Sequence, residues 1–165
     1  MITTTGALIL IGPVTLIALW AAFSDLKRMK IPNLAVLALA ALWPLLGWLA
    51  VASWAAWFWG FALMVIVLFL GFALYTTGTF GAGDGKYAAA MAPIFVGADL
   101  VRLLLIIFAC MVGALVLHRV ARSIPAIRKM TPDWESWTQK RYFPLGLALS
   151  GIVVFYLVAA IWAQV

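Results

Sequence analysis

Residues 54–75 read WAAWFWGFALMVIVLFLGFALY, a stretch without a single charged side chain. A helix needs about 20 apolar residues to cross a hydrocarbon core of roughly 30 Å, so this stretch is long enough to span a membrane. The whole chain has 165 residues, of which 67% are hydrophobic and 10% are charged, a balance that no water-soluble domain of this size could bury. The sequence therefore predicts an all-α membrane protein.

Further apolar runs lie on both sides of this stretch. They cover approximately residues 5–23, 34–51, 86–98, 100–117 and 144–163. Together with the stretch at 54–75 they predict six transmembrane helices in one membrane domain, residues 1–165. The short run at 86–98 could instead join the next run, but Asp99 and Arg102 would then lie at mid-membrane, at a cost of about 2.5 to 3.5 kcal/mol each. We therefore predict a tight hairpin between these two runs.

The net charge of +6 predicts orientation in the membrane, not nucleic-acid binding, because the basic residues occupy short segments between apolar runs. With six helices and both the N- and C-termini outside, only Arg102 among the basic residues falls on the outer side. The others lie in cytoplasmic loops: Lys27, Arg28, Lys30, Lys86, Arg119, Arg122, Arg128, Lys129, Lys140 and Arg141. The expected partner of these loops is membrane lipid.

The longest inner loop is predicted at residues 118–143, where proline and tryptophan are mixed with charged residues. This composition is typical of an interfacial segment that contacts anionic headgroups, and a substrate-docking surface is the alternative. His118, the single histidine, is expected to be solvated and interfacial at the inner end of the fifth helix.

The predicted topology places most of the acidic residues on the inner side: Asp25, Asp84, Asp133 and Glu135. Asp25 closes the first helix and Asp84 opens the fourth, so both lie near the same membrane face. An ionisable residue at a membrane edge is a candidate for function. The alternative is structural, with Asp25 as a helix-end acid beside basic residues and Asp84 as a helix cap.

Two carboxyl groups held about 3 Å apart in a low-dielectric site cannot both ionise, so they share one proton. The ionised group can take a proton from a water molecule that attacks a peptide carbonyl, while the protonated group donates to the carbonyl oxygen. This is the chemistry of an aspartyl protease. The pair titrates as a unit, so the sequence does not assign the two roles.

Asp84 lies in the glycine-rich stretch GTFGAGDGK, residues 78–86. Gly81 and Gly83 permit unusual backbone angles and the close approach of an extended peptide. Gly81-Ala82-Gly83-Asp84 resembles the GxGD signature of membrane aspartyl proteases, and Lys86 follows it as in many prepilin peptidases.

A second stretch, DLKRMKIPN at residues 25–33, is similar to the other aspartate motif of that family, in which basic residues and then Ile-Pro-Asn follow the acid. A third match is Phe143-Pro144-Leu145-Gly146, which resembles the family's Pro-x-Gly entry to the last helix. Gly85 stands where the family often has an apolar residue.

The resemblance to type IV prepilin peptidases implies that Asp25 and Asp84 are the catalytic pair. Their supporting residues would be Gly81, Gly83, Lys86, Pro32 and Asn33. It further implies cleavage of the basic leader of prepilins or pseudopilins at the cytoplasmic face of a bacterial inner membrane, with water and the two aspartates and no cofactor. We find no spacing typical of a zinc, calcium or phosphate site.

The chain lacks the cytoplasmic insert with paired cysteines that the long bifunctional members carry, since Cys110 is its single cysteine. Methyltransferase activity is therefore not expected, and the chain is more similar to the short Flp/Tad (CpaA-like) branch. The competing hypothesis is a non-catalytic transporter subunit or pilus-assembly scaffold in which the aspartates form ion pairs or a proton relay. The sequence leaves the oligomeric state open.

Overall fold

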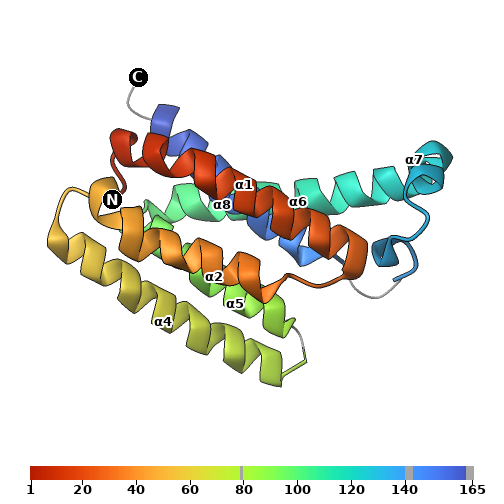
Figure 1. The fold of residues 1–165 in the computed structure, drawn as a ribbon, viewed down its shortest axis with the longest axis horizontal. Helices are drawn as coiled ribbons and strands as arrows, with labels where there is room; N and C mark the ends of the chain where they lie inside the picture. Colours follow the sequence, from red (N-terminus) through yellow and green to blue (C-terminus); the bar gives the residue numbers. More distant parts are fainter. Residues whose placement is uncertain (79, 140–142, 163–165) are drawn as a thin grey trace.

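A computed structural model describes residues 1–78, 80–139 and 143–162 as a bundle of helices (Figure 1). Thr79, Lys140 and Arg141, which the sequence analysis used, lie outside these residues. Five helical segments are long and apolar enough to cross a membrane. They are α1 (Thr4–Arg28), the continuous segment of α2 (Asn33–Leu42), the π-helix η1 (Trp43–Gly47) and α3 (Trp48–Ala50), then α4 (Trp54–Thr76), α6 (Leu100–Ser123) and α8 (Leu145–Trp162).

The predicted fourth run forms a shorter element in two parts, α5 (Ala82–Met91) and the 3₁₀ helix η2 (Ala92–Phe95). At about 1.5 Å per α-helical residue this element is shorter than the hydrocarbon core. It returns along the bundle in the direction opposite to α4, and both chain termini lie at the same end of the bundle (Figure 1). It packs against α2, α4 and α8, which makes α5 an internal helix.

The predicted hairpin between this element and α6 is present, so the single merged helix is excluded. Gly97 adopts a φ of 66°, a left-handed conformation that breaks the helix. Asp99 then caps α6, because its carboxylate accepts a hydrogen bond of 2.7 Å from the backbone N–H of Arg102.

The core of the bundle lies between the first and last long helices, α1 and α8. Small and medium apolar residues on one face of α1 meet larger ones on α8. The buried residues are Ala7, Leu10, Val14, Ala18 and Ala21 on α1 and Leu149, Ile152, Val153, Tyr156 and Leu157 on α8. Their spacing of three and four residues defines one helical face on each partner, so the two helices pack along most of their length.

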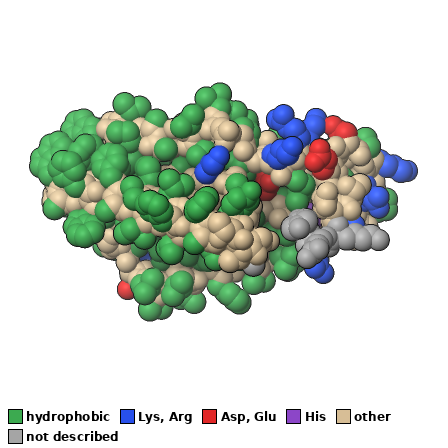
Figure 2. Space-filling view, turned by 90° about the horizontal axis from the view of Figure 1, so that it is seen from below, with side chains coloured by type: hydrophobic (Ala, Val, Ile, Leu, Met, Phe, Trp, Pro, Cys, Tyr) green, Lys and Arg blue, Asp and Glu red, His purple; other side chains and the backbone are tan. Residues whose placement is uncertain are grey.

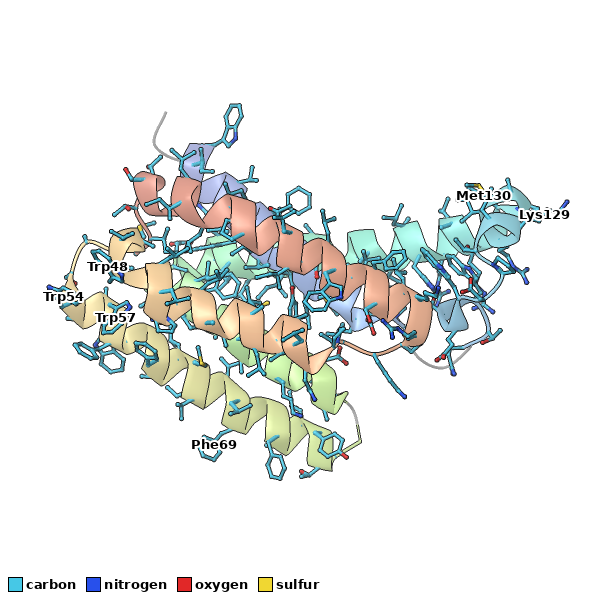
Figure 3. All side chains as sticks on the ribbon, viewed as in Figure 1. Trp48, Trp54, Trp57, Phe69, Lys129 and Met130 are labelled. Atoms are coloured by element: carbon cyan, nitrogen blue, oxygen red, sulfur yellow. The ribbon has the colours of Figure 1, made fainter. Side chains whose placement is uncertain are left out.

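Trp43, in the π-helix, joins the second segment to α4. Its indole N–H donates to the carbonyl of Trp57 at 3.0 Å, and the indole N–H of Trp57 donates to the carbonyl of Trp43 at 3.2 Å. Gly47 and Gly60 lie against the Trp43 ring, where a Cβ atom would collide. Trp57 lies at the end of the bundle opposite Lys129 (Figure 3), so this tryptophan cluster closes the end far from the basic segment.

Gly71 on α4 and Gly85 on α5 bring these two helices into backbone contact. A Cβ atom on Gly71 would lie 2.9 Å from the Cα atom of Gly85, and one on Gly85 would lie 3.2 Å from the Cα atom of Gly71. Close approach through small residues is a common way to pack helices in lipid. It also explains Gly85, because the apolar residue common in the family at this position would not fit against α4.

Most charged side chains gather at one end of the molecule, and apolar side chains cover much of the rest of the face seen in Figure 2. Many large apolar side chains are exposed on α4 and α6, among them Phe69 and Phe108, each 70% exposed. Apolar surface of this extent is stable only in contact with lipid or with another protein, so it agrees with a position in the membrane.

The predicted inner loop begins later than expected, because α6 continues through Ser123 and is followed by α7 (Pro125–Met130) and the 3₁₀ helix η3 (Glu135–Trp137). The expectation that His118 is solvated is wrong, since its side chain is only 6% exposed. Its ring stacks on Trp137, with centroids 5.2 Å apart, and meets the edge of Phe143. The segment after α6 folds back over the end of that helix, which covers the histidine.

The inner segment, residues 124–139, is also attached to α1. Lys27 and Asp133 form an ion pair of 2.9 Å, and the rings of Phe23 and Trp134 meet edge to face at 5.7 Å. The hydrogen bond from Lys27 holds the pKa of Asp133 below its ordinary value of 3.8. The ion pair is therefore intact at pH values well above 3.8 and is lost as the pH falls through the lowered pKa of Asp133, because protonation removes the negative charge.

We predict that Gly71→Ala and Gly85→Ala each lower the free energy of unfolding by about 1–3 kcal/mol, because each added methyl group meets backbone atoms of the facing helix. Thermal unfolding in detergent measures this effect. Gly113→Ala on α6 is the control, since a Cβ atom there meets nothing within 4 Å. Equal midpoints for all of these variants would contradict the close packing of α4 and α5.

We predict that Asp133→Asn raises the rate of tryptic cleavage in the inner segment about twofold at pH 7, because an exposed ion pair restrains it only weakly. The difference should disappear in 1 M salt, which screens exposed charges. Limited proteolysis of inverted membrane vesicles measures both rates, and Glu135→Gln in the same segment is the control. An Asp133→Asn rate equal to the wild-type rate at low salt would show that the ion pair does not restrain the segment.

Candidate active site

Asp25 lies in the last turn of α1 and is only 4% exposed. Its Oδ2 atom accepts a hydrogen bond of 2.7 Å from the backbone N–H of Gly146, the second residue of α8. The first amides of a helix lack partners within the helix, and they carry the positive end of its dipole. The start of α8 therefore supplies a donor for a carboxyl group that would otherwise be buried without one.

The turn after Asp25 connects α1 to α2 and bends sharply at Met29, where φ is 50°. The backbone N–H of Met29 donates to the carbonyl of Asp25 at 2.8 Å, and the hydroxyl of Ser24 donates to the carbonyl of Lys30 at 2.9 Å. Pro32, with φ near −63°, then leads into α2. These local bonds fix the path of the chain beside Asp25.

Asp84 is the third residue of α5, so its carboxylate can reach back to the start of its own helix. It accepts a hydrogen bond from the backbone N–H of Gly81, the residue that precedes α5. This arrangement is the acidic half of a capping box, and it places negative charge at a helix N-terminus, where the helix dipole stabilises it. The alternative that Asp84 is the N-cap of its helix is therefore wrong, because Gly81 is the N-cap and Asp84 bonds back to it from inside the first turn.

The α1–α2 turn packs against the beginning of α5 and so brings the two motifs together. A Cβ atom built on Gly83 would lie 3.8 Å from the Cβ atom of Ile31, which is an ordinary contact. Asp25 and Asp84 line one cavity of about 1100 Å³, and their carboxyl groups interact electrostatically. Two acids 59 positions apart in the sequence thus share one cavity.

The structure brings together every site residue that the sequence analysis named. The cavity is lined by Asp25, Pro32, Asn33, Gly81, Gly83, Asp84 and Lys86. It is also lined by Ser24, Leu145, Phe143 and Gln139, which the sequence analysis did not single out as site residues. The sequence carried signals for three of them, because Ser24 is adjacent to Asp25 and because Phe143 and Leu145 belong to the third motif. Gln139 carried no signal.

The alternative that Asp25 is an ordinary helix-end acid does not agree with its contacts. A helix-end acid would be expected to pair with Lys27 or Arg28, but Lys27 points to Asp133. Asp25 instead points into the protein toward Gly146. Burial of a carboxyl group beside a second acid lowers the stability of the fold. Such an arrangement is typical of an active site.

The chemistry available here is acid–base chemistry by two carboxyl groups that face a shared cavity. Such a pair holds one proton more readily than none or two, and it can both accept a proton from water and donate one to a substrate. Across residues 1–78, 80–139 and 143–162, no group of three or more His, Cys, Asp or Glu side chains is placed to hold a metal ion.

Comparison with known proteins agrees with this description. Neither a curated protein nor a solved structure matches the chain. A family model, described as the type IV leader peptidase family, matches residues 13–118, which include both aspartates and more than half of the chain. The chain therefore belongs to the type IV leader peptidase family, and as a member of it is a prepilin peptidase.

Proposed function

We propose that Asp25 and Asp84 form the catalytic pair of this peptidase, an intramembrane aspartyl endopeptidase. One observation carries the proposal: carboxyl groups from α1 and α5 line a single cavity of a membrane bundle. The substrates of the family are prepilins. We propose that the bond cleaved here joins the basic leader to the mature pilin or pseudopilin at the cytoplasmic face.

In this mechanism the ionised aspartate removes a proton from a water molecule in the cavity as the water oxygen attacks the scissile carbonyl carbon. The protonated aspartate donates its proton to the carbonyl oxygen, which yields a neutral tetrahedral intermediate. As the C–N bond breaks, the new N-terminal amine takes a proton from the aspartate that was protonated by water. The other aspartate removes a hydroxyl proton from the intermediate, which becomes the new carboxyl group, and the pair returns to its shared-proton state. Each step uses only water and the two carboxyl groups.

The residues around the pair would shape the peptide path. Gly81 and Gly83 leave the space beside Asp84 free of side chains, so an extended segment of substrate can approach it. Pro32 and Asn33 open α2 and hold the turn that follows Asp25. Lys86 would balance the charge of Asp84 near the membrane edge.

Basic residues also line the cavity, namely Arg28, Lys30 and Lys86. They would repel the basic residues of a leader in a low-dielectric site. We therefore expect only the cleavage junction to enter the cavity, with the charged part of the leader held outside it in the cytoplasm.

We propose six crossings of the bacterial inner membrane, made by the five long segments and by α5 with η2. Support comes from the alternating direction of successive segments and from the two termini at one end of the bundle (Figure 1). The basic residues of the inner segment lie at the other end, as the position of Lys129 illustrates (Figure 3). By the positive-inside rule this end faces the cytoplasm and both termini face outward.

We also propose that the protein acts in the Flp/Tad branch of the family, on Flp-type prepilins or pseudopilins. The support is its compact form, since the long connections of the bifunctional members are missing between its helices. Without the paired cysteines of those members, we expect no methylation of the new N-terminus.

We predict that Asp25→Asn and Asp84→Asn each lower the rate of leader cleavage by a factor of about 10³ or more, because the pair acts as one unit. Co-expression with a Flp-type prepilin, followed by the change in pilin size, measures cleavage. Asp99→Asn is the matched control, since Asn also caps a helix and Asp99 lies at the far end of α6 from the inner segment. Normal processing by either dyad variant would exclude the proposed pair.

We predict that single cysteines replacing Asp25 and Asp84, in a Cys110→Ala background, react with a small membrane-impermeant thiol reagent from the cytoplasmic side only. Inverted vesicles and intact spheroplasts provide the two sides. Ser53→Cys and Met130→Cys are the outer and inner controls, because both residues are exposed. Labelling of the two aspartate positions from opposite sides would contradict a shared site.

A further inference from the structure

The first turn of α8 holds Asp25 by two features of a single residue, Gly146. Its backbone N–H donates to Oδ2 of Asp25 at 2.7 Å in a buried environment. The bond joins residues 121 positions apart, so it links the first and last long helices at the cavity. Leu145, the neighbour of Gly146, lines the same cavity.

The second feature is the missing side chain. A Cβ atom on Gly146 would lie 2.9 Å from Oδ2, 3.0 Å from Cβ and 3.1 Å from Cγ of Asp25. All of these contacts are shorter than ordinary van der Waals distances, and they involve the whole length of the Asp25 side chain. A methyl group at this position would therefore push the carboxyl group away from its hydrogen-bond donor.

The backbones on either side have little freedom to relieve such a collision. Ala21, one turn before Asp25 on α1, and Ala148, just beyond Gly146 on α8, are both fully buried. Asp25 lines the cavity, whereas the helix positions beside it, Ala21 and Ala148, have no exposed surface. The carboxyl group is thus the part that would move, and it would move within the site.

We propose that Gly146 is a positioning residue of the peptidase, which sets the location of the Asp25 carboxyl group through its amide and its lack of a side chain. The proposal rests on the proposed role of Asp25 in catalysis. It also gives a physical reason for the glycine of the Pro144-Leu145-Gly146 motif at this site.

The first test is kinetic and uses the full-length protein in detergent with a prepilin substrate. We expect Gly146→Ala to lower kcat about 10- to 100-fold, because a displacement of about 1 Å at a catalytic group has effects of this size, with KM changed by no more than about twofold. Gly151→Ala on the same helix is the matched control, since its Cβ atom would lie 3.6 Å from Sγ of Cys110, an ordinary contact. A wild-type kcat for Gly146→Ala would overturn the proposal.

The second test measures stability and does not depend on activity. We compare the effect of Gly146→Ala on the melting temperature in the wild-type background and in an Asp25→Ala background. The substitution should lower the melting temperature by about 3 °C or more when Asp25 is present, and by little when the collision has been removed. An equal decrease in both backgrounds would show that Gly146 serves only the packing of α8, which overturns the proposal.

If Gly146→Ala does not yield folded protein, recovery of folding in the double variant supports the proposal, and failure of the double variant overturns it. The two proposals fail separately. Near-normal cleavage by Asp25→Asn would exclude the proposed catalytic pair, and the stability coupling between Gly146 and Asp25 could still be observed. Loss of cleavage in Asp25→Asn with normal kcat in Gly146→Ala would leave the dyad and end the positioning role.

Discussion

The hydrogen bond between Gly146 and Asp25 joins the end of α1 to the beginning of α8, and the rest of the site is arranged around it. A buried carboxyl group without a donor would cost several kcal/mol in a medium that offers little water. The start of a helix is one of the few places in a membrane protein where free backbone donors exist. The packing of α1 along α8 brings this donor to Asp25, and the α1–α2 turn then carries the chain to α5 and Asp84.

Glycine contacts determine how closely the other helices approach. Association of helices in lipid gains nothing from the hydrophobic effect, so it depends on close packing and hydrogen bonds. Gly71 and Gly85 bring α4 and α5 together, and Gly60 accepts the ring of Trp43. The helix α5 is short and depends on its neighbours for its position. The packing of α5 against α4 therefore helps to determine where Asp84 lies.

The inner segment is joined to α1 and α6 beside the site. A continuous series of rings runs from Phe23 on α1 through Trp134 and Trp137 of the segment to His118 on α6. The ion pair of Lys27 with Asp133 also joins the segment to α1. Gln139, just after this series, lines the cavity. The segment therefore forms part of the wall of the candidate active site.

The sequence by itself determined the membrane environment, the long helices and the residues around the two acids. Transfer to lipid depends on the composition of each stretch of about 20 residues, and the motifs at Asp25 and Asp84 are local, so both can be read without a fold. Only the tertiary structure decided that Gly146 holds Asp25, that Gly85 packs on Gly71, and that His118 is buried. The physical reason is that lipid-facing and protein-facing positions of a membrane helix are both apolar, so hydrophobic periodicity does not reveal which faces meet. Those contacts depend on how the surfaces of neighbouring helices fit together, which is known only from the packed structure.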